Sequence, residues 1–143
     1  MGVNLGWAAE QARGTGVRLL IEAQNPHNAP GFVLQGQARA ATVVDAAAAE
    51  QPVLLFDIYH AHHTEKDLHA SLERAWPHVF HVQVADAPER HEPGTGDIDS
   101  FRVFAHPEEH KYRGWIGCEY APADSTTSGL VWRRTPPTAV LSP

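Results

Sequence analysis

Several features of secreted, membrane and nucleic-acid-binding proteins are scarce or missing in this sequence. It has one cysteine, Cys118, which has no partner for an internal disulfide, so a reducing compartment, by default the cytoplasm, is expected. No apolar run approaches the roughly 20 residues that a bilayer-spanning helix needs. Lysine and arginine total 11 against 17 acidic residues, and the formal net charge of −6 argues against a non-specific nucleic-acid binder, which needs a basic face. These absences predict an acidic globular protein with neither a nucleic-acid nor a membrane partner.

The rest of the composition is that of an ordinary globular domain, apart from its histidines. Hydrophobic residues make up 43% of the 143 positions, which is typical of a folded chain with one core. The ten histidines are more than such a composition predicts, and they indicate either metal chemistry or sequence drift. Five of them fall in helical or loop segments, and we expect these five to lie on the solvated surface: His62, His63, His69, His106 and His110.

Four short apolar runs alternate with helical segments along the chain. The runs predict strands at 17–21, 53–56, 79–84 and 112–119. The remaining segments predict helices at 4–13, 35–50, 65–75 and from about 98. Asn4 is the predicted cap of the first helix. Alternating strands and helices indicate βα units with a parallel sheet, and nearly continuous apolar runs are typical of strands covered on both faces. The sequence therefore predicts an α/β fold.

Proline marks two places where the helical pattern is expected to fail. Pro107 falls in the helix that begins near residue 98, where the ring removes a hydrogen bond and clashes with the preceding turn at a cost of ~3 kcal/mol or more. We expect that helix to be shortened or broken. Beyond Trp132, Pro136 and Pro137 cannot continue a helix, and residues 133–143 are expected to form a disordered tail.

One polar residue stands at the end of each predicted strand: Glu22, Asp57, Gln83 and Glu119. In an α/β barrel the C-terminal ends of the strands converge on the active site, so these ends would bring three carboxylates and one amide together. Clustered carboxylates repel one another, and a divalent cation would neutralise them. Ligation by oxygen alone selects Mg²⁺ or Mn²⁺. The alternative is that each residue merely begins a solvated loop.

Other polar residues near the strand ends could complete such a site. His60 follows Asp57 by three residues on the segment that leaves the second strand. The segment from Pro88 to Gly96 carries charge, and it could place Arg90 or Glu92 on an anionic or hydroxylated substrate. We take His60, Arg90 and Glu92 as candidate substrate-binding residues, with an ordinary surface loop as the alternative for the last two.

Four motifs in order resemble those of hydroxypyruvate isomerases, a family of the xylose-isomerase-like barrels. They lie at Leu20–Glu22, Asp57–His60, His81–Asp86 continuing into Arg90–Gly96, and Gly114–Tyr120. The resemblance spans residues 4–132. It implies a metal-dependent isomerase that interconverts hydroxypyruvate and 2-hydroxy-3-oxopropanoate. It further implies that Glu22 and Glu119 are an acid/base pair and metal ligands, with Asp57 and Gln83 completing the coordination.

The resemblance also implies a partial (β/α)8 barrel, since a whole one needs ~250 residues. Residues 1–132 would form the C-terminal half, with about four βα units and parallel strands. We expect a truncated sequence whose open sheet edges favour self-association or pairing with an N-terminal half-barrel. Two alternatives stay open. One is another sugar or keto-acid isomerase or epimerase of the same barrels, and the other is an inactive fragment acting as a binding or assembly subunit.

Overall fold

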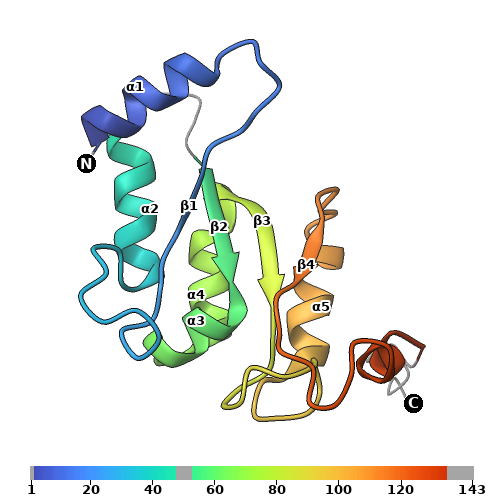
Figure 1. Ribbon diagram of the computed structural model, residues 1–143. Helices are drawn as coiled ribbons and strands as arrows, with labels where there is room; N and C mark the ends of the chain where they lie inside the picture. The colour runs from blue at the N-terminus through green and yellow to red at the C-terminus, as the bar shows by residue number, and fades with distance from the viewer. Residues whose placement is uncertain (1, 48–52, 135–143) are drawn as a thin grey trace.

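The structure is a computed structural model, and it describes residues 2–47 and 53–134 (Figure 1). Four parallel strands form one sheet in the order β1-β2-β3-β4. The strands are β1 (Leu20–Glu22), β2 (Val53–Asp57), β3 (Val79–Val84) and β4 (Ile116–Cys118). Strands that neighbour one another in space also follow one another in sequence, as they do in an α/β barrel. The predicted α/β fold with about four parallel βα units is confirmed.

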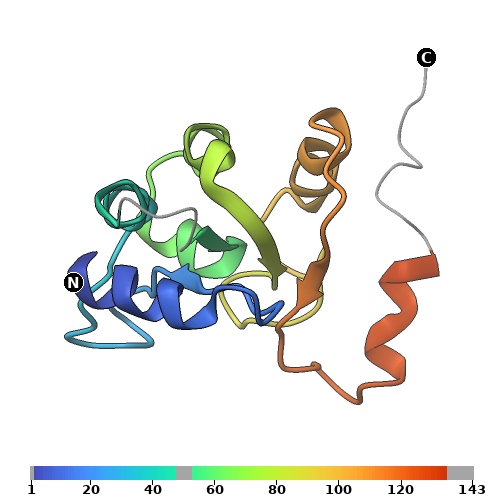
Figure 2. The same ribbon diagram turned by 90° about the horizontal axis from the view of Figure 1, so that it is seen from above.

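The described residues form helices at the N-terminus and after each strand, and some of these helices cover one side of the sheet (Figure 2). Five are α-helices: α1 (Gly2–Ala12), α2 (Gln37–Ala46), α3 (Ile58–Thr64), α4 (Leu68–Ala75) and α5 (Ser100–Glu109). Two are 3₁₀-helices, η1 (Trp76–His78) and η2 (Ser128–Arg134). Seen from above, α2, α4 and α5 form an arc along one side of the strands (Figure 2). In the described part of the chain, no helix is long and apolar enough to cross a membrane.

Strand alternation sorts the side chains of the sheet onto two faces. On β2, Leu54 and Phe56 are fully buried and belong to the core that the helices complete. Their neighbours on β2 point to the opposite face, because successive strand residues alternate. Asp57 pairs with Gln83, and Gln83 pairs with Gly117, so all three lie on that second face. In a closed barrel this is the inner face.

Several local predictions differ from the structure. No helix was predicted between the second strand and residue 65, but α3 fills this segment, because the Asp57 side chain accepts a hydrogen bond from the His60 N–H and caps a new helix. The prediction that Asn4 caps the first helix is wrong, since α1 already begins at Gly2. The first and last strands are also shorter than predicted, because the pairing with β2 and β3 covers three residues of each.

Pro107 does not break its helix as predicted. It lies inside α5, which continues through Glu109, and the backbone N–H of His110 still bonds to the carbonyl of His106. A proline this close to the helix end removes one hydrogen bond and leaves the last turn intact. His106, which was expected at the solvated surface, has a side chain only 12% exposed, so that prediction is wrong. The predicted tail at 133–143 lies outside the described residues from position 135 onward.

We predict that Leu54→Ala lowers the free energy of unfolding by about 2–5 kcal/mol, because truncating a fully buried leucine leaves a cavity in the core. Urea unfolding followed by circular dichroism measures the change. The matched control is Val33→Ala at a side chain that is 53% exposed, which should change the free energy by less than about 0.5 kcal/mol. Equal effects of the two substitutions would contradict this placement of the core.

Candidate active site

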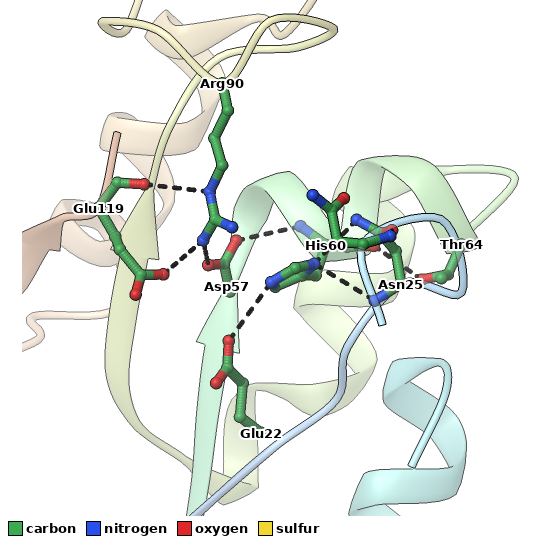
Figure 3. Close-up of polar contacts among 8 residues, drawn as sticks. Glu22, Asn25, Asp57, His60, Thr64, Arg90 and Glu119 are labelled. Atoms are coloured by element: carbon green, nitrogen blue, oxygen red, sulfur yellow. Dashed lines mark hydrogen bonds and ion pairs between the residues drawn. The ribbon is translucent and has the colours of Figure 1, made fainter. Parts of the chain in front are cut away.

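The strand-end residues gather at one edge of the sheet. Glu22 is the last residue of β1 and Asp57 the last residue of β2. Gln83 is the penultimate residue of β3, and Glu119 directly follows β4, where its backbone N–H bonds to the Val84 carbonyl. Figure 3 shows Glu22 and Glu119 directed toward the neighbourhood of Asp57 from two sides. The expected convergence of these three carboxylates is therefore present in the fold.

Asp57 is almost completely buried, and His60 and Arg90 both contact its carboxylate. Oδ1 accepts a hydrogen bond of 3.0 Å from the His60 N–H, and Oδ2 lies 3.4 Å from Arg90 Nη2. Burial raises the pKa of Asp57, against the lowering by the His60 N–H and the Arg90 charge. His60 and Arg90 therefore do not fully offset the free-energy cost of burying the charged carboxylate, and an additional positive charge would stabilise it.

Arg90 supplies the positive charge that the cluster has in this structure. Its Nη2 lies 2.6 Å from Glu119 Oε2, its Nε donates to the Glu119 carbonyl at 3.3 Å, and the guanidinium lies over the ring of Tyr59. The residue that was predicted to bind substrate thus pairs with two of the predicted metal ligands, Asp57 and Glu119 (Figure 3).

The loop that carries Arg90 is organised by Asp86. This buried carboxylate accepts hydrogen bonds from the backbone N–H groups of Ala87, Gly94 and Ile98, which tie both ends of the loop to the end of β3. Within it, Arg90 has a φ of 59°, a left-handed conformation that few residues other than glycine adopt. The Asp86 anchor therefore aims Arg90 at the carboxylates.

Two buried oxygens at this edge have no hydrogen-bond partner among the described residues: Glu22 Oε1 and Gln83 Oε1. Burial raises the pKa of Glu22, and the charge of Glu119 raises it further. Buried acceptors without a partner are rare in folded proteins because each costs desolvation energy. A cation between Glu22, Asp57 and Gln83 would satisfy both oxygens, so the donor set fits the predicted metal.

His60 is held in one orientation by Asn25. Its Nδ1 accepts from the Asn25 backbone N–H at 3.2 Å and lies 2.8 Å from the Asn25 side-chain Nδ2. The Asn25 amide is itself oriented, because its Oδ1 accepts from the Asn28 N–H. Since a backbone N–H can only donate, Nδ1 must be the acceptor and the ring proton must sit on Nε2. That N–H is directed toward Glu22, with 3.7 Å between Nε2 and Oε1.

The proton on Nε2 makes His60 a hydrogen-bond donor toward the cluster rather than a metal ligand. Ligand atoms of Glu22, Asp57 and His60 all lie within 4.8 Å of one another, a spacing that fits a metal site. However, His60 Nε2 carries a proton in this arrangement and has no lone pair to give. The metal-binding atoms that remain are oxygens, which agrees with a hard cation.

Glu92 does not join the cluster. It is 95% buried, and both of its carboxylate oxygens accept from the Ala123 N–H at 3.2–3.3 Å. These contacts hold the segment after β4 against the Arg90 loop. Its predicted role in substrate binding stays a prediction that no contact of the structure supports.

The sequence analysis gave no role to two residues on which the site depends, Asn25 and Asp86, although Asp86 ends the third of the family motifs. Asn25 follows the end of β1 by three residues, as His60 follows that of β2, so the repeated spacing was an available signal. Asp86 follows β3 and resembles an ordinary loop residue. Only its burial and its three backbone partners distinguish it.

Comparison with known proteins identifies the protein family to which the chain belongs. Residues 3–135 match the family model described as the xylose isomerase-like TIM barrel, and the chain belongs to this family. Hydroxypyruvate isomerase of Escherichia coli is 37% identical over 129 residues, and 2-oxo-tetronate isomerase of Cupriavidus necator is 37% identical over the same length. Each alignment covers 90% of this chain and 50% of the relative, so the chain spans about half the length of these relatives.

A solved structure shows the same architecture. The crystal structure described as an AP endonuclease, family 2, from Brucella melitensis superposes with a TM-score of 0.88 at 35% identity, over 92% of this chain and 51% of that one. The fold is accordingly a partial TIM barrel, as the sequence predicted.

We predict that imidazole ¹⁵N NMR finds His60 neutral at neutral pH, with its proton on Nε2, because burial lowers its pKa to about 4 and Asn25 occupies Nδ1. In Asn25→Ala one of the two donors to Nδ1 is lost, and we expect the ring to lose its single orientation. The control is Asn28→Ala, which keeps the backbone N–H that bonds to Asn25. A wild-type ring with its proton on Nδ1 would contradict the hydrogen-bond assignment.

Proposed function

We propose that this chain carries the proton-transfer and cation-binding residues of an isomerase that acts on a short hydroxy keto acid. One observation carries the proposal: Glu22 and Glu119 flank Asp57, and the buried oxygens of Glu22 and Gln83 have no partner among the described residues. The names of the two bacterial relatives, hydroxypyruvate isomerase and 2-oxo-tetronate isomerase, support this substrate class.

Glu22, Asp57, Gln83 and Glu119 are the residues that would hold Mg²⁺ or Mn²⁺. Such an ion polarises the carbonyl and hydroxyl oxygens of the substrate and lowers the energy of an enediolate. The cost of burying Asp57 and the lack of a partner for Gln83 Oε1 both support this donor set.

Isomerisation of hydroxypyruvate to 2-hydroxy-3-oxopropanoate moves a carbonyl by one carbon. One proton leaves the carbon that bears the hydroxyl group, and one is delivered to the neighbouring carbon. The hydroxyl proton also moves, to the oxygen that was the carbonyl oxygen, so the hydroxyl and carbonyl groups exchange places. Glu22 and Glu119 carry out the two transfers at carbon, since each can accept or donate a proton from its own side of the cluster. The raised pKa of Glu22 brings it closer to working pH, which favours proton transfer.

His60 and Arg90 bind the substrate in this proposal. The His60 Nε2–H is directed into the cluster and is a donor for a substrate oxygen. Arg90 now balances Asp57 and Glu119, and a bound divalent cation would take over that balance. The guanidinium is then available for the carboxylate of the keto acid, which it can bind through two parallel hydrogen bonds.

We predict that Glu22→Gln and Glu119→Gln each lower isomerase activity by about 10²-fold or more, because an amide cannot transfer the proton. The assay measures loss of hydroxypyruvate, and separately of 2-oxo-tetronate, with added Mg²⁺ or Mn²⁺. It uses the chain alone and the chain mixed with the N-terminal half of the Escherichia coli relative.

The matched control is Glu89→Gln, an exposed acid on the Arg90 loop, which should leave activity unchanged. Full activity in Glu22→Gln or Glu119→Gln would contradict the assigned roles. If the wild-type chain is inactive under both conditions and binds no Mn²⁺, the alternative of an inactive binding subunit is favoured instead.

Self-association is a further part of the proposal. Within the described residues β1 and β4 are the outer strands, each with a free edge, and Trp115 beside β4 is 85% exposed. Free edges and exposed aromatic residues favour pairing with another chain. We predict a dimer or larger species in sedimentation velocity, reduced by Trp115→Lys. A monomer that melts cooperatively would refute the prediction.

A further inference from the structure

A second group of metal-ligand side chains lies on the helices rather than at the strand ends. Glu73 is on α4, His106 is on α5, and His110 is the residue that ends α5. His106 and His110 are four residues apart, so both project from the same side of the helix. Candidate ligand atoms of all three residues lie within 4.8 Å of one another.

The distances fit ligation better than hydrogen bonding. Glu73 Oε2 lies 3.6 Å from His106 Nδ1 and 3.6 Å from His110 Nε2. Both separations are too long for a hydrogen bond. Ligands that bind tetrahedral Zn²⁺ at their usual bond lengths of roughly 2.0–2.2 Å are roughly 3.3–3.5 Å from one another. Small adjustments of the exposed Glu73 side chain would complete that geometry.

The lone pair of His110 faces the carboxylate. Its Nδ1 lies 2.9 Å from the His106 carbonyl, which can only accept, so Nδ1 carries the proton. Its Nε2 is then unprotonated in the neutral ring and lies on the Glu73 side. A histidine whose second nitrogen donates to a backbone carbonyl is the usual arrangement in metal sites. The same carbonyl also accepts the His110 backbone N–H, which fixes the ring to the helix.

The nitrogen of His106 that faces Glu73 is Nδ1, at 3.6 Å from Oε2. The other nitrogen, Nε2, is buried and has no hydrogen-bond partner among the described residues, so the ring is held by packing. The ring lies between Trp76, with centroids 4.6 Å apart, and His110, with centroids 4.2 Å apart. Two protonated rings this close would repel each other, so a pair of His–Glu ion pairs does not account for the cluster.

We propose that Glu73, His106 and His110 form a Zn²⁺ site that links α4 to α5 on the outer side of the half-barrel. Two imidazole nitrogens and one carboxylate oxygen are a donor set that zinc prefers over Mg²⁺. Glu73 and His106 also line an open groove of about 460 Å³, together with His69 and Arg102. Water in this groove can reach the fourth coordination position. The ion would connect two successive βα units and stabilise the folded chain.

Calorimetric titration with Zn²⁺ tests the proposal, using the full chain with millimolar Mg²⁺ present throughout. The wild type should bind one equivalent that His110→Gln loses, and Zn²⁺ should raise the thermal unfolding midpoint of the wild type but not of that variant. His69→Gln, a groove histidine outside the cluster, and Glu22→Gln at the strand ends should both keep this equivalent. Glu73→Gln is a second ligand variant with an exposed side chain, and circular dichroism without metal verifies that each variant is folded.

Two results would overturn the site. One is unchanged Zn²⁺ binding in both His110→Gln and Glu73→Gln. The other is loss of the equivalent in Glu22→Gln with retention in His110→Gln, which would assign the bound zinc to the strand ends. The proposal does not depend on isomerase activity, so an inactive chain leaves it intact.

Discussion

The pairing of β2 with β3 is the constraint on which the rest of this molecule depends. The register that pairs Phe56 with Val82 places both in the core, and the next pair, Asp57 with Gln83, comes to the opposite face. A slip of one residue would exchange the two faces and bury a carboxylate among the helices. The same register that builds the core therefore also gathers the polar groups of the candidate active site.

The sequence predicted the framework of that site because strand and barrel geometry are regular. Apolar runs ending in Glu22, Asp57 and Glu119 were sufficient to place three carboxylates at one edge of a parallel sheet. The contacts among them were not predictable in the same way. Arg90 reaches Asp57 and Glu119 from a loop that Asp86 holds closed through backbone N–H groups, and no periodicity in the sequence predicts that closure. The helix α3 was also not predicted. The Asp57 side chain there caps a helix by accepting a hydrogen bond from a backbone N–H, where a solvated loop was the alternative considered.

The positions of histidines along the sequence did not predict their surroundings in the fold. A surface position was the general expectation for His106 and His110, because both fall in a helical segment of an acidic chain. Their separation by four residues was visible in the sequence, whereas Glu73 comes from another helix and is brought near only by the packing of α4 beside α5. His60 differs again, since Asn25 fixes its tautomer and makes it a donor rather than a ligand. His110 shows the opposite arrangement, since its Nδ1 donates to the His106 carbonyl and its unprotonated Nε2 is left for a metal.

The short lengths of β1 and β4 limit how strongly the outer strands of this sheet can pair with another chain. A sheet with two free edges can add copies in two ways, either closing into a ring or growing without limit. Here the paired part of each outer strand is three residues long, which offers few backbone groups to an incoming chain. Unlimited growth would therefore gain little per added copy. A closed ring of eight strands would pair both edges of the sheet at once, whereas an open stack would always leave two edges unpaired.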